Sequence, residues 1–255
     1  MNILITGGNG YLATALKRMT SSEITVVTRQ DLDLRSSVEV NRFFSDKYFD
    51  VVIHTAIDGG SRLRVDTMSI MDNNLRMYYN ILDNQHKFDR FISIGSGAEL
   101  YQINTAYGLS KHVIRQSMLE NSICYNIRVF AVFDENELPT RFIKSNINRY
   151  IKKEPILIHQ NKQMDFFYMD DFINVMEYYI TEKTPPKEFN CTYDYSYSLL
   201  DVANKINMLS DYKVSIDIEK PEMGVKFSGE PNNIKFNYVG LDEGIQRVYN
   251  KLCKI

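Results

Sequence analysis

An excess of charge of one sign is the first thing that this 255-residue sequence lacks. Its formal net charge is −2, and no block of like charges occurs, so nothing in it indicates a nucleic acid or a membrane surface as a partner. Long apolar runs are missing too, and none approaches the length of a membrane span. Because the first residues already form a strand-like run, we expect no signal peptide.

Cysteine is also scarce. The sequence has three, Cys124, Cys191 and Cys253, at unrelated spacings, which argues against a disulfide framework and against a metal site. Such a set fits a reducing cytoplasm, where we expect the protein to be found. Repeats and low-complexity tracts are absent. A chain of this length with 44% hydrophobic residues can bury one substantial core, which predicts one globular unit.

Strand-like and helical runs alternate through the first half of the sequence. This alternation is typical of βαβ units and predicts an α/β fold with a Rossmann-type, doubly wound parallel sheet. The ligand crevice should lie beyond the carboxyl ends of the strands. The expected strands are Asn2–Thr6, Ile24–Thr28, Val51–Thr55, Arg90–Ile94 and Cys124–Phe130, and the expected helices are Leu12–Met19, Ser37–Lys47, Ile70–Gln85 and Gly108–Glu120.

From about Phe133 the elements become shorter, tyrosine-rich and charged. We therefore interpret residues 1–132 as a dinucleotide-binding core and residues 133–255 as a smaller, C-terminal substrate-binding lobe of the same globular unit. The elements expected in this lobe are helices at Arg141–Lys152 and Asp171–Thr181, a strand at Ile156–Ile158, and a helix capped by Ser198.

A glycine-rich turn follows the first strand, with the spacing Gly7-x-x-Gly10-x-x-Ala13. This spacing differs from the common G-x-G-x-x-G pattern. A strand that breaks at glycines and re-enters as a helix still presents bare backbone N–H groups and a positive helix end to a pyrophosphate. A tight turn in an unrelated α/β protein is the alternative.

A Tyr-x-x-x-Lys element begins at Tyr107. Lys111 lies one helical turn further on the same face, where an ammonium stabilises the phenolate and lowers the pKa of the tyrosine toward neutrality. Tyr107 can then exchange a proton near pH 7. By itself the spacing also occurs on solvated helix faces. Together with the glycine turn and the strand-like run before Ser96, it indicates a redox enzyme.

These motifs resemble the extended short-chain dehydrogenase/reductase family, in the branch that acts on nucleotide-activated sugars. The resemblance covers nearly the whole chain. Among the members it is closest to GDP-fucose synthase and, less closely, to dTDP-4-dehydrorhamnose reductase, through Arg29–Leu34. The other segments that carry it are Asp50–Ala56, Asn73–Leu75, Asp165–Asp171 and Leu241–Ile245.

The resemblance implies a reaction centre. In it, Ser96 matches the serine that hydrogen-bonds the sugar oxygen, Tyr107 delivers the proton, and Lys111 tunes Tyr107 and binds the nicotinamide ribose. The implied reaction is hydride transfer to C4 of a 4-keto sugar. The residues assigned to the substrate are Ser96, Gly97, Glu99, Arg141 and Lys162.

The resemblance also implies a cofactor site. NAD-preferring members keep an acidic residue at the end of the second strand, whereas this sequence has Arg29 there, at the position of a phosphate-binding arginine of GDP-fucose synthase. A guanidinium favours a 2′-phosphate, so we expect NADP(H), with NAD(H) as the second option; a solvated surface arginine is the alternative. The residues assigned to the cofactor are Gly7, Gly10, Tyr11, Leu12, Arg29, Asp33, Leu34, Thr55, Ala56, Asn74, Tyr107 and Lys111.

The sequence departs from the family pattern in three places. Only eleven positions separate Ser96 from Tyr107, where relatives usually have a longer loop that forms a wall of the sugar site. The cysteine and histidine that epimerise the sugar in GDP-fucose synthase have no counterparts. The arginine that binds the nucleotide diphosphate is replaced by Met164, and Lys162, Arg141 or Lys144 either substitutes for it or is a surface charge.

Glu99 has two interpretations. Counted back from Tyr101, it falls where dehydratase relatives carry a glutamate base; counted forward from Ser96, Ala98 takes that place. A solvated loop carboxylate is the other interpretation, and Glu99 would then be dispensable for carbonyl reduction.

Three functional hypotheses follow. The first is an NADPH-dependent reductase of a nucleotide-linked 4-keto-6-deoxy sugar. The second is an epimerase or dehydratase that recycles NAD and uses Glu99, and the third is a catalytically idle dinucleotide-binding sensor or scaffold. We also expect a homodimer formed by the Tyr107 helix and the helix Ile70–Gln85, with Met71, Tyr78 and Leu82 in the interface unless they belong to the core.

Overall fold

The computed structural model describes residues 1–19, 23–60 and 65–254. Their packing separates the chain into two compact units. Unit 1 comprises Met1–Arg128 and Met176–Phe189, and unit 2 comprises Val129–Val175 and Asn190–Ile255. The sequence-based division makes one cut at residue 132, whereas here residues 176–189 return to the first unit.

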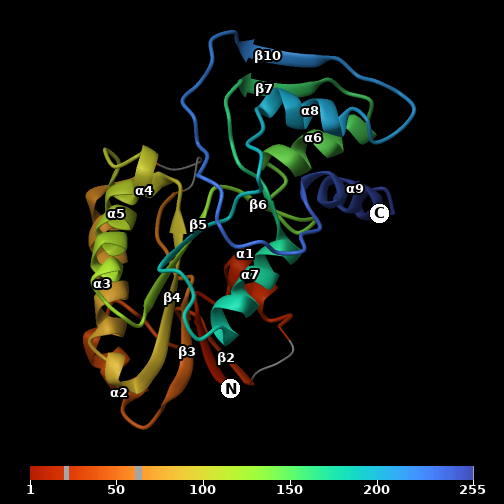
Figure 1. Cartoon of the computed structure of the whole chain (residues 1–255). Coiled ribbons are helices and arrows are strands. Elements are labelled where there is room, and N and C mark those ends of the chain that lie inside the picture. Colours follow the sequence, from red (N-terminus) through yellow and green to blue (C-terminus); the bar gives the residue numbers. More distant parts are fainter. Residues whose placement is uncertain (20–22, 61–64, 255) are drawn as a thin grey trace. The chain divides into compact units, whose positions relative to one another are not determined.

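The central sheet has six strands in the order β2-β1-β3-β4-β5-β9 (Figure 1). β1 pairs in parallel with both β2 and β3, and β3 pairs in parallel with β4. The predicted α/β fold with a Rossmann-type parallel sheet is confirmed. The strands are β1 Asn2–Thr6, β2 Glu23–Val27, β3 Phe49–His54, β4 Phe88–Ser96, β5 Cys124–Val129 and β9 Glu188–Asn190.

Apolar residues on alternating strands and helices bury a core in unit 1. Its aromatic part runs through Phe49, Phe44, Phe88, Phe91 and Tyr78, whose successive ring centres lie 5.7–6.0 Å apart. The helices of this unit are α1 Tyr11–Leu16, α2 Ser37–Phe44, α3 Met68–Leu82, α4 Ala98–Tyr101 and α5 Ala106–Leu119, with a 3₁₀ turn, η1, at Gln85–Lys87, and α7 Met169–Thr181 ends in it.

α3 and α5 lie side by side (Figure 1). Tyr78 of α3 is fully buried and Leu82 is 9% exposed, and both belong to the core of unit 1. The expectation that these two side chains form a dimer interface is therefore wrong, because both pack into the core of unit 1 and are not available to a second subunit.

Unit 2 has its own core around three helices and two short parallel strand pairs. β6 pairs with β8, and β7 pairs with β10. Ser198 caps α8 in a capping box with Asp201, which confirms the predicted cap. The elements are β6 Val132–Phe133, α6 Phe142–Ile151, β7 Ile156–Gln160, β8 Phe167–Tyr168, α8 Leu199–Ile206, β10 Ile216–Lys220 and α9 Leu241–Leu252.

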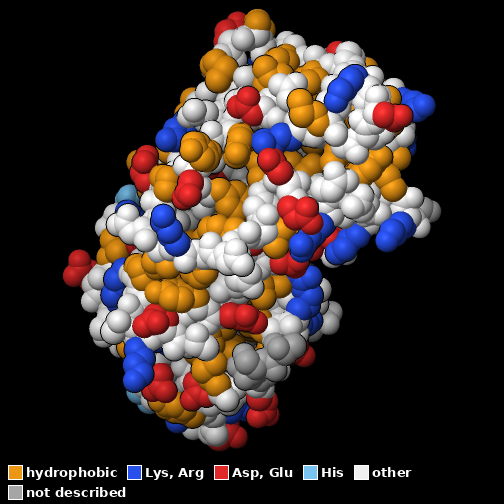
Figure 2. Space-filling view, turned by 45° about the vertical axis from the view of Figure 1, so that its right-hand side comes forward, with side chains coloured by type: hydrophobic (Ala, Val, Ile, Leu, Met, Phe, Trp, Pro, Cys, Tyr) orange, Lys and Arg blue, Asp and Glu red, His pale blue; other side chains and the backbone are white. Residues whose placement is uncertain are grey.

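The surface carries both signs of charge. Figure 2 shows acidic and basic side chains on the same visible face, in keeping with the net charge of −2. Among the described residues, no helix is both long enough and apolar enough to cross a membrane.

Candidate active site

A cavity of about 290 Å³ in unit 1 gathers most of the predicted cofactor residues. It lies where β1, β2 and β3 end, as expected for a parallel sheet. Its lining includes Gly7, Gly10, Arg29, Asp33, Leu34, Thr55 and Ala56 from the predicted set, and Asn9, Val27, Thr28, Leu32, Arg35, Ile57, Asp58, Asn73 and Met77 in addition. Tyr11, Leu12, Asn74, Tyr107 and Lys111 are not among the residues that line it.

The glycine turn supplies Gly7, Asn9 and Gly10 to the wall of this cavity. Gly7 has φ +73°, and a Cβ atom there would lie 2.7 Å from the backbone nitrogen of Ala56. A Cβ on Gly8 would lie 2.5 Å from Cγ1 of Val26. Side chains at these positions would collide with Ala56 and Val26, so glycine lets the turn pack closely against β2 and the segment that follows β3. Such a close-packed glycine turn fits a dinucleotide site.

Charged residues in the turn after β2 have distinct partners. Asp31 accepts hydrogen bonds from the backbone and hydroxyl of Thr28, at 2.9 and 2.7 Å. Asp33 accepts two from Arg35, from Nε at 2.9 Å and from Nη2 at 2.6 Å, and these bonds lower its pKa to about 2. Arg29 is exposed and lines the cavity. A cofactor at this end of the cavity would therefore meet the exposed guanidinium of Arg29, while both nearby carboxylates have partners within the turn.

Sequence reasoning missed Arg35. The available signal was its position two residues after Asp33, because an acidic and a basic side chain at that spacing in a turn can form an ion pair. In the structure this pair fixes the Asp33 side chain at the cavity wall.

The predicted catalytic residues come from two neighbouring elements of unit 1. Ser96 is the last residue of β4, and Tyr107 and Lys111 lie on α5. Thr105 caps α5 by accepting a hydrogen bond from the backbone of Gly108 at 3.0 Å, which places Tyr107 in the first turn of the helix.

Two buried contacts hold α5 in place. Asn74 of α3 donates to the hydroxyl of Ser110 at 3.0 Å, so Asn74 braces the helix. The ammonium of Lys111 donates to the carbonyl of Ile94 at 2.5 Å. Burial lowers the pKa of Lys111 to about 8, and the negative charge of Glu99 acts in the opposite direction.

The hydroxyl groups of the centre are also constrained. Ser96 Oγ accepts a hydrogen bond from the backbone of Ala98 at 3.2 Å, which leaves its hydrogen to donate to another oxygen. Gly60, with φ +69°, packs on Tyr107 so closely that a Cβ would lie 2.8 Å from Cζ of the ring.

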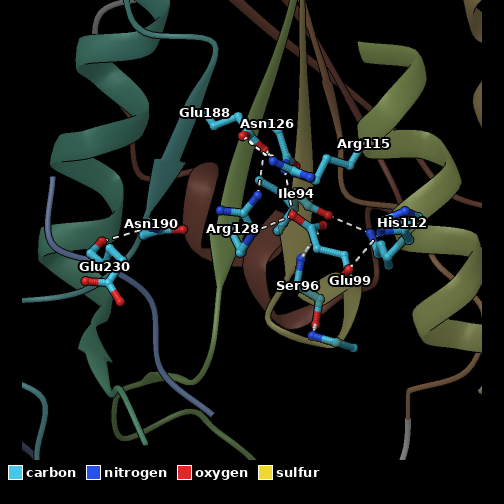
Figure 3. Close-up of polar contacts among 12 residues, drawn as sticks. Ile94, Ser96, Glu99, His112, Arg115, Asn126, Arg128, Glu188, Asn190 and Glu230 are labelled. Atoms are coloured by element: carbon cyan, nitrogen blue, oxygen red, sulfur yellow. Dashed lines mark hydrogen bonds and ion pairs between the residues drawn. The ribbon is translucent and has the colours of Figure 1, made fainter. Parts of the chain in front are cut away.

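Glu99 is buried, with 1% of its surface exposed. The prediction of a solvated loop carboxylate is wrong. Figure 3 shows it between β4, β5 and α5. Its Oε1 accepts from Asn126 Nδ2 at 2.8 Å and from Arg128 Nε, and its Oε2 accepts from the backbone of Ser96 at 3.2 Å. Neither counting rule reveals this, because both partners on β5 lie far along the chain.

The ion pair between Glu99 and Arg128 extends to β9. Arg128 Nη2 donates to Glu188 at 2.5 Å, and Arg115 of α5 donates twice to Glu188, at 2.5 and 2.7 Å. The network therefore links α4, α5, β5 and β9 beside the end of β4 (Figure 3); Glu99 and Arg128 are buried in it, and Arg115 and Glu188 are partly exposed.

A family model for the NAD dependent epimerase/dehydratase family matches residues 3–192, most of the chain. The chain belongs to this family. It is thus an extended short-chain dehydrogenase/reductase of the nucleotide-sugar type, and an enzyme of an NAD(P)-dependent family.

Proteins that are similar to this family member have different activities. CDP-abequose synthase of Yersinia pseudotuberculosis is 22% identical over 209 residues, which are 71% of this chain and 74% of that protein. UDP-glucuronic acid 4-epimerase from Bacillus cereus matches with a TM-score of 0.78 at 17% identity, over 100% and 99% of the two chains. GDP-mannoheptose C4 reductase from Campylobacter jejuni matches with a TM-score of 0.76 at 17% identity, over 99% and 98%. These structures share the fold.

Two of the five predicted substrate residues of this epimerase/dehydratase family member, Arg141 and Lys162, lie far along the sequence from Ser96 and Tyr107, whereas Gly97 and Glu99 follow Ser96 closely. Gly97 precedes α4 directly. Arg141 precedes α6, is exposed, and lies 3.9 Å from Oε2 of Glu137. Lys162 places its ammonium 5.5 Å from the ring centre of Phe227.

The position that carries a diphosphate-binding arginine in relatives is apolar here. Met164 is 5% exposed and packs in the core of unit 2. Its backbone forms an isolated parallel β-bridge with Phe227. The ammonium of Lys144 donates to the carbonyls of Glu135 and Glu137, at 2.6 and 2.8 Å, so Lys144 is a poor substitute for the arginine.

Proposed function

We propose that the protein is an NADPH-dependent reductase of a nucleotide-linked 4-keto-6-deoxy sugar. One observation carries this proposal: Arg29 lies exposed on the wall of the dinucleotide cavity, while the carboxylates in the same turn are held by Thr28 and Arg35. A 2′-phosphate would meet a cation there, and net reduction is the reaction that consumes NADPH.

The chain's own residues would hold the cofactor along this cavity. The turn at Gly7 and Gly10 would receive the pyrophosphate, Thr55 and Ala56 would lie under the ribose, and Arg29 would pair with the 2′-phosphate. When bound, the reduced nicotinamide supplies the hydride.

Three side chains would handle the sugar carbonyl. Ser96 donates a hydrogen bond to the carbonyl oxygen, and Tyr107 gives that oxygen the proton that completes the alcohol. The ammonium of Lys111, one turn from Tyr107, stabilises the phenolate that this transfer leaves behind. The phenolate then recovers a proton from solvent.

An epimerase or dehydratase with recycled NAD is the second candidate, because the family includes such enzymes. The buried position of Glu99 counts against it. Both carboxylate oxygens already accept hydrogen bonds from the protein, so Glu99 is badly placed to remove a proton from a sugar carbon.

In the decisive experiment the protein is incubated with each of a panel of nucleotide-linked 4-keto-6-deoxy sugars and with NADPH or NADH, and oxidation of the nicotinamide is followed. We expect oxidation of NADPH in stoichiometric amounts with one panel member, and a product reduced at C4. Exchange of solvent deuterium into carbon 3 or 5 without net oxidation of the nicotinamide would support the second candidate. Tight cofactor binding with neither reaction would support the idle sensor. We also place the protein in the cytoplasm, because the number and spacing of its three cysteines argue against a disulfide framework.

A further inference from the structure

We propose that Glu99 is a positioning residue of the reaction centre, which holds Ser96 in place and faces Lys111 with a counter-charge. This inference rests on the roles of Ser96 and Lys111 in the proposed function. It replaces both interpretations of Glu99 that the sequence allowed, the solvated carboxylate and the catalytic base.

The first argument is geometric. Glu99 is buried, and Asn126 and Arg128 of β5 fix one of its carboxylate oxygens. The other oxygen accepts the N–H of Ser96 at 3.2 Å. The backbone carbonyl of Glu99 lies 3.0 Å from Nδ1 of His112 on α5. Glu99 thus ties the end of β4 to β5 through its side chain and α4 to α5 through its backbone.

Asn126 and Glu99 pack closely against the backbone of Gly95, next to Ser96. A Cβ on Gly95 would lie 2.3 Å from Oδ1 of Asn126 and 2.9 Å from Oε2 of Glu99. Ser96 itself accepts from the N–H of Ala98, so the backbone and the hydroxyl of Ser96 are each fixed by α4. These two hydrogen bonds fix the position of the Ser96 oxygen, and a fixed oxygen is what a preorganised donor requires.

The second argument concerns charge. Lys111 is buried, and Glu99 supplies the negative charge that raises its pKa against the effect of burial. Among the described residues of the sheet, His54 of β3 also interacts with Lys111, and burial lowers its pKa to about 3, so that it is neutral. Arg128 of β5 is the cation that pairs with Glu99. On α5 itself, Tyr107 is uncharged until it gives up its proton. Glu99 therefore helps Lys111 to remain an ammonium.

The test compares Glu99→Gln with Glu188→Gln. Both changes remove one carboxylate from the same ion-pair network, but only Glu99 contacts Ser96 and influences Lys111. The titration of Lys111 is followed by NMR of protein labelled at lysine Cε, with the resonance assigned by its loss in Lys111→Met. Loss of a nearby opposite charge should move the Lys111 midpoint down by on the order of one pH unit in Glu99→Gln, and Glu188→Gln should leave it in place. An unmoved midpoint in Glu99→Gln would overturn the proposal.

Turnover supplies the second measurement. In Glu99→Gln, kcat should fall about tenfold or more while the dissociation constant of NADPH stays within about twofold, because removal of one positioning contact affects the reacting atoms and not the cofactor cavity. Glu99→Asp keeps the charge and shortens the reach to Ser96, so it should restore the Lys111 midpoint without restoring kcat. Unchanged kcat in Glu99→Gln would contradict the positioning role.

Thermal unfolding of each variant is the control that shows whether the variant is folded. If Glu99→Gln does not fold, the double variant with Arg128→Gln removes both members of the buried pair. Because this variant loses a positive charge together with the negative one, it is read by kcat and not by the Lys111 midpoint: kcat should fall about tenfold or more, since the contact with Ser96 is lost, and an unchanged kcat overturns the proposal. If no sugar of the panel is reduced by the wild type, the proposed function fails, while the NMR titration still decides the role of Glu99.

Discussion

Tyr107 offers the sharpest test at the scale of single residues. Tyr107→Phe removes the proton donor but keeps the ring that packs on Gly60, so the fold and the cofactor cavity should be preserved. We expect turnover to fall on the order of a hundredfold or more, with NADPH binding nearly unchanged. Steady-state kinetics and a binding titration check both parts, and a variant that keeps most of its reductase activity would show that proton delivery is wrongly assigned.

We expect Arg29 to set the preference between NADPH and NADH. A charge-assisted contact to a phosphate contributes about 1.5–3 kcal/mol, roughly ten- to a hundredfold in affinity. NADPH should bind more tightly than NADH by about that factor, and Arg29→Ala should remove most of the difference by weakening NADPH alone. Fluorescence titrations of both cofactors measure this. Equal weakening of both would mean that Arg29 holds the fold or the adenine.

Lys111 sets a limit on pH. Its pKa is lowered to about 8 by burial, so the ammonium is present below that pH and is lost as the pH rises through it. Because the charge stabilises the Tyr107 phenolate, kcat should decline above about pH 8. A kcat profile from pH 6 to pH 10 checks this, and constant turnover up to about two units above the pKa would contradict it.

Among the elements, α4 and α5 meet at Gly108. A Cβ at this position would lie 2.0 Å from the carbonyl oxygen of Gln102 and 2.9 Å from that of Ala98. Backbone atoms cannot move aside cheaply, so Gly108→Ala should destabilise the protein by about 1–3 kcal/mol or more. Thermal unfolding measures the loss. Gly224→Ala is the matched control, because the atoms nearest to its Cβ would belong to the flexible side chain of Gln160. An equal effect of both substitutions would contradict the explanation.

The elements also show what a sequence can predict. The strand Asn2–Thr6 is found with its predicted bounds, and helices such as Arg141–Lys152 are found within one residue at each end, because alternation and helical spacing are local signals. The four-residue helix α4 was missed, since it has no room for a periodic pattern. The burial of Glu99, which lies on α4, was missed for a different reason. Its partners Asn126 and Arg128 come from β5, far along the sequence.

The same contrast holds for the candidate site. Glycines that need a positive φ, and a tyrosine and a lysine one helical turn apart, can be recognised from spacing alone. The assignments to Arg141 and Lys162 rest only on charge and position, and neither contact that the structure gives them, with Glu137 and with Phe227, could be read from spacing.

At the scale of the whole molecule we expect a homodimer through α3 and α5. With Tyr78 and Leu82 in the core, the exposed apolar side chains Met68, Tyr79 and Leu119, at 68%, 41% and 36%, are among those that can take part. Tyr79→Glu should convert the dimer into a monomer in sedimentation velocity at micromolar concentration. Tyr195→Glu, on an exposed tyrosine of unit 2, is the control. A wild-type protein that sediments only as a monomer would dismiss the expectation.

The return of residues 176–189 to unit 1 has a consequence for synthesis on the ribosome. β5 obtains its second neighbour, β9, and Arg115 and Arg128 obtain the carboxylate of Glu188, only after residues 129–175 of unit 2 have been made. Chains emerge from the N-terminus and domains usually fold as they appear. Here the nascent chain must leave one sheet edge open, with unpaired backbone groups, over that whole interval. Assembly of unit 1 therefore finishes late. A translation arrest before residue 188 should leave the backbone groups of β5 unpaired, and chaperones should bind this edge.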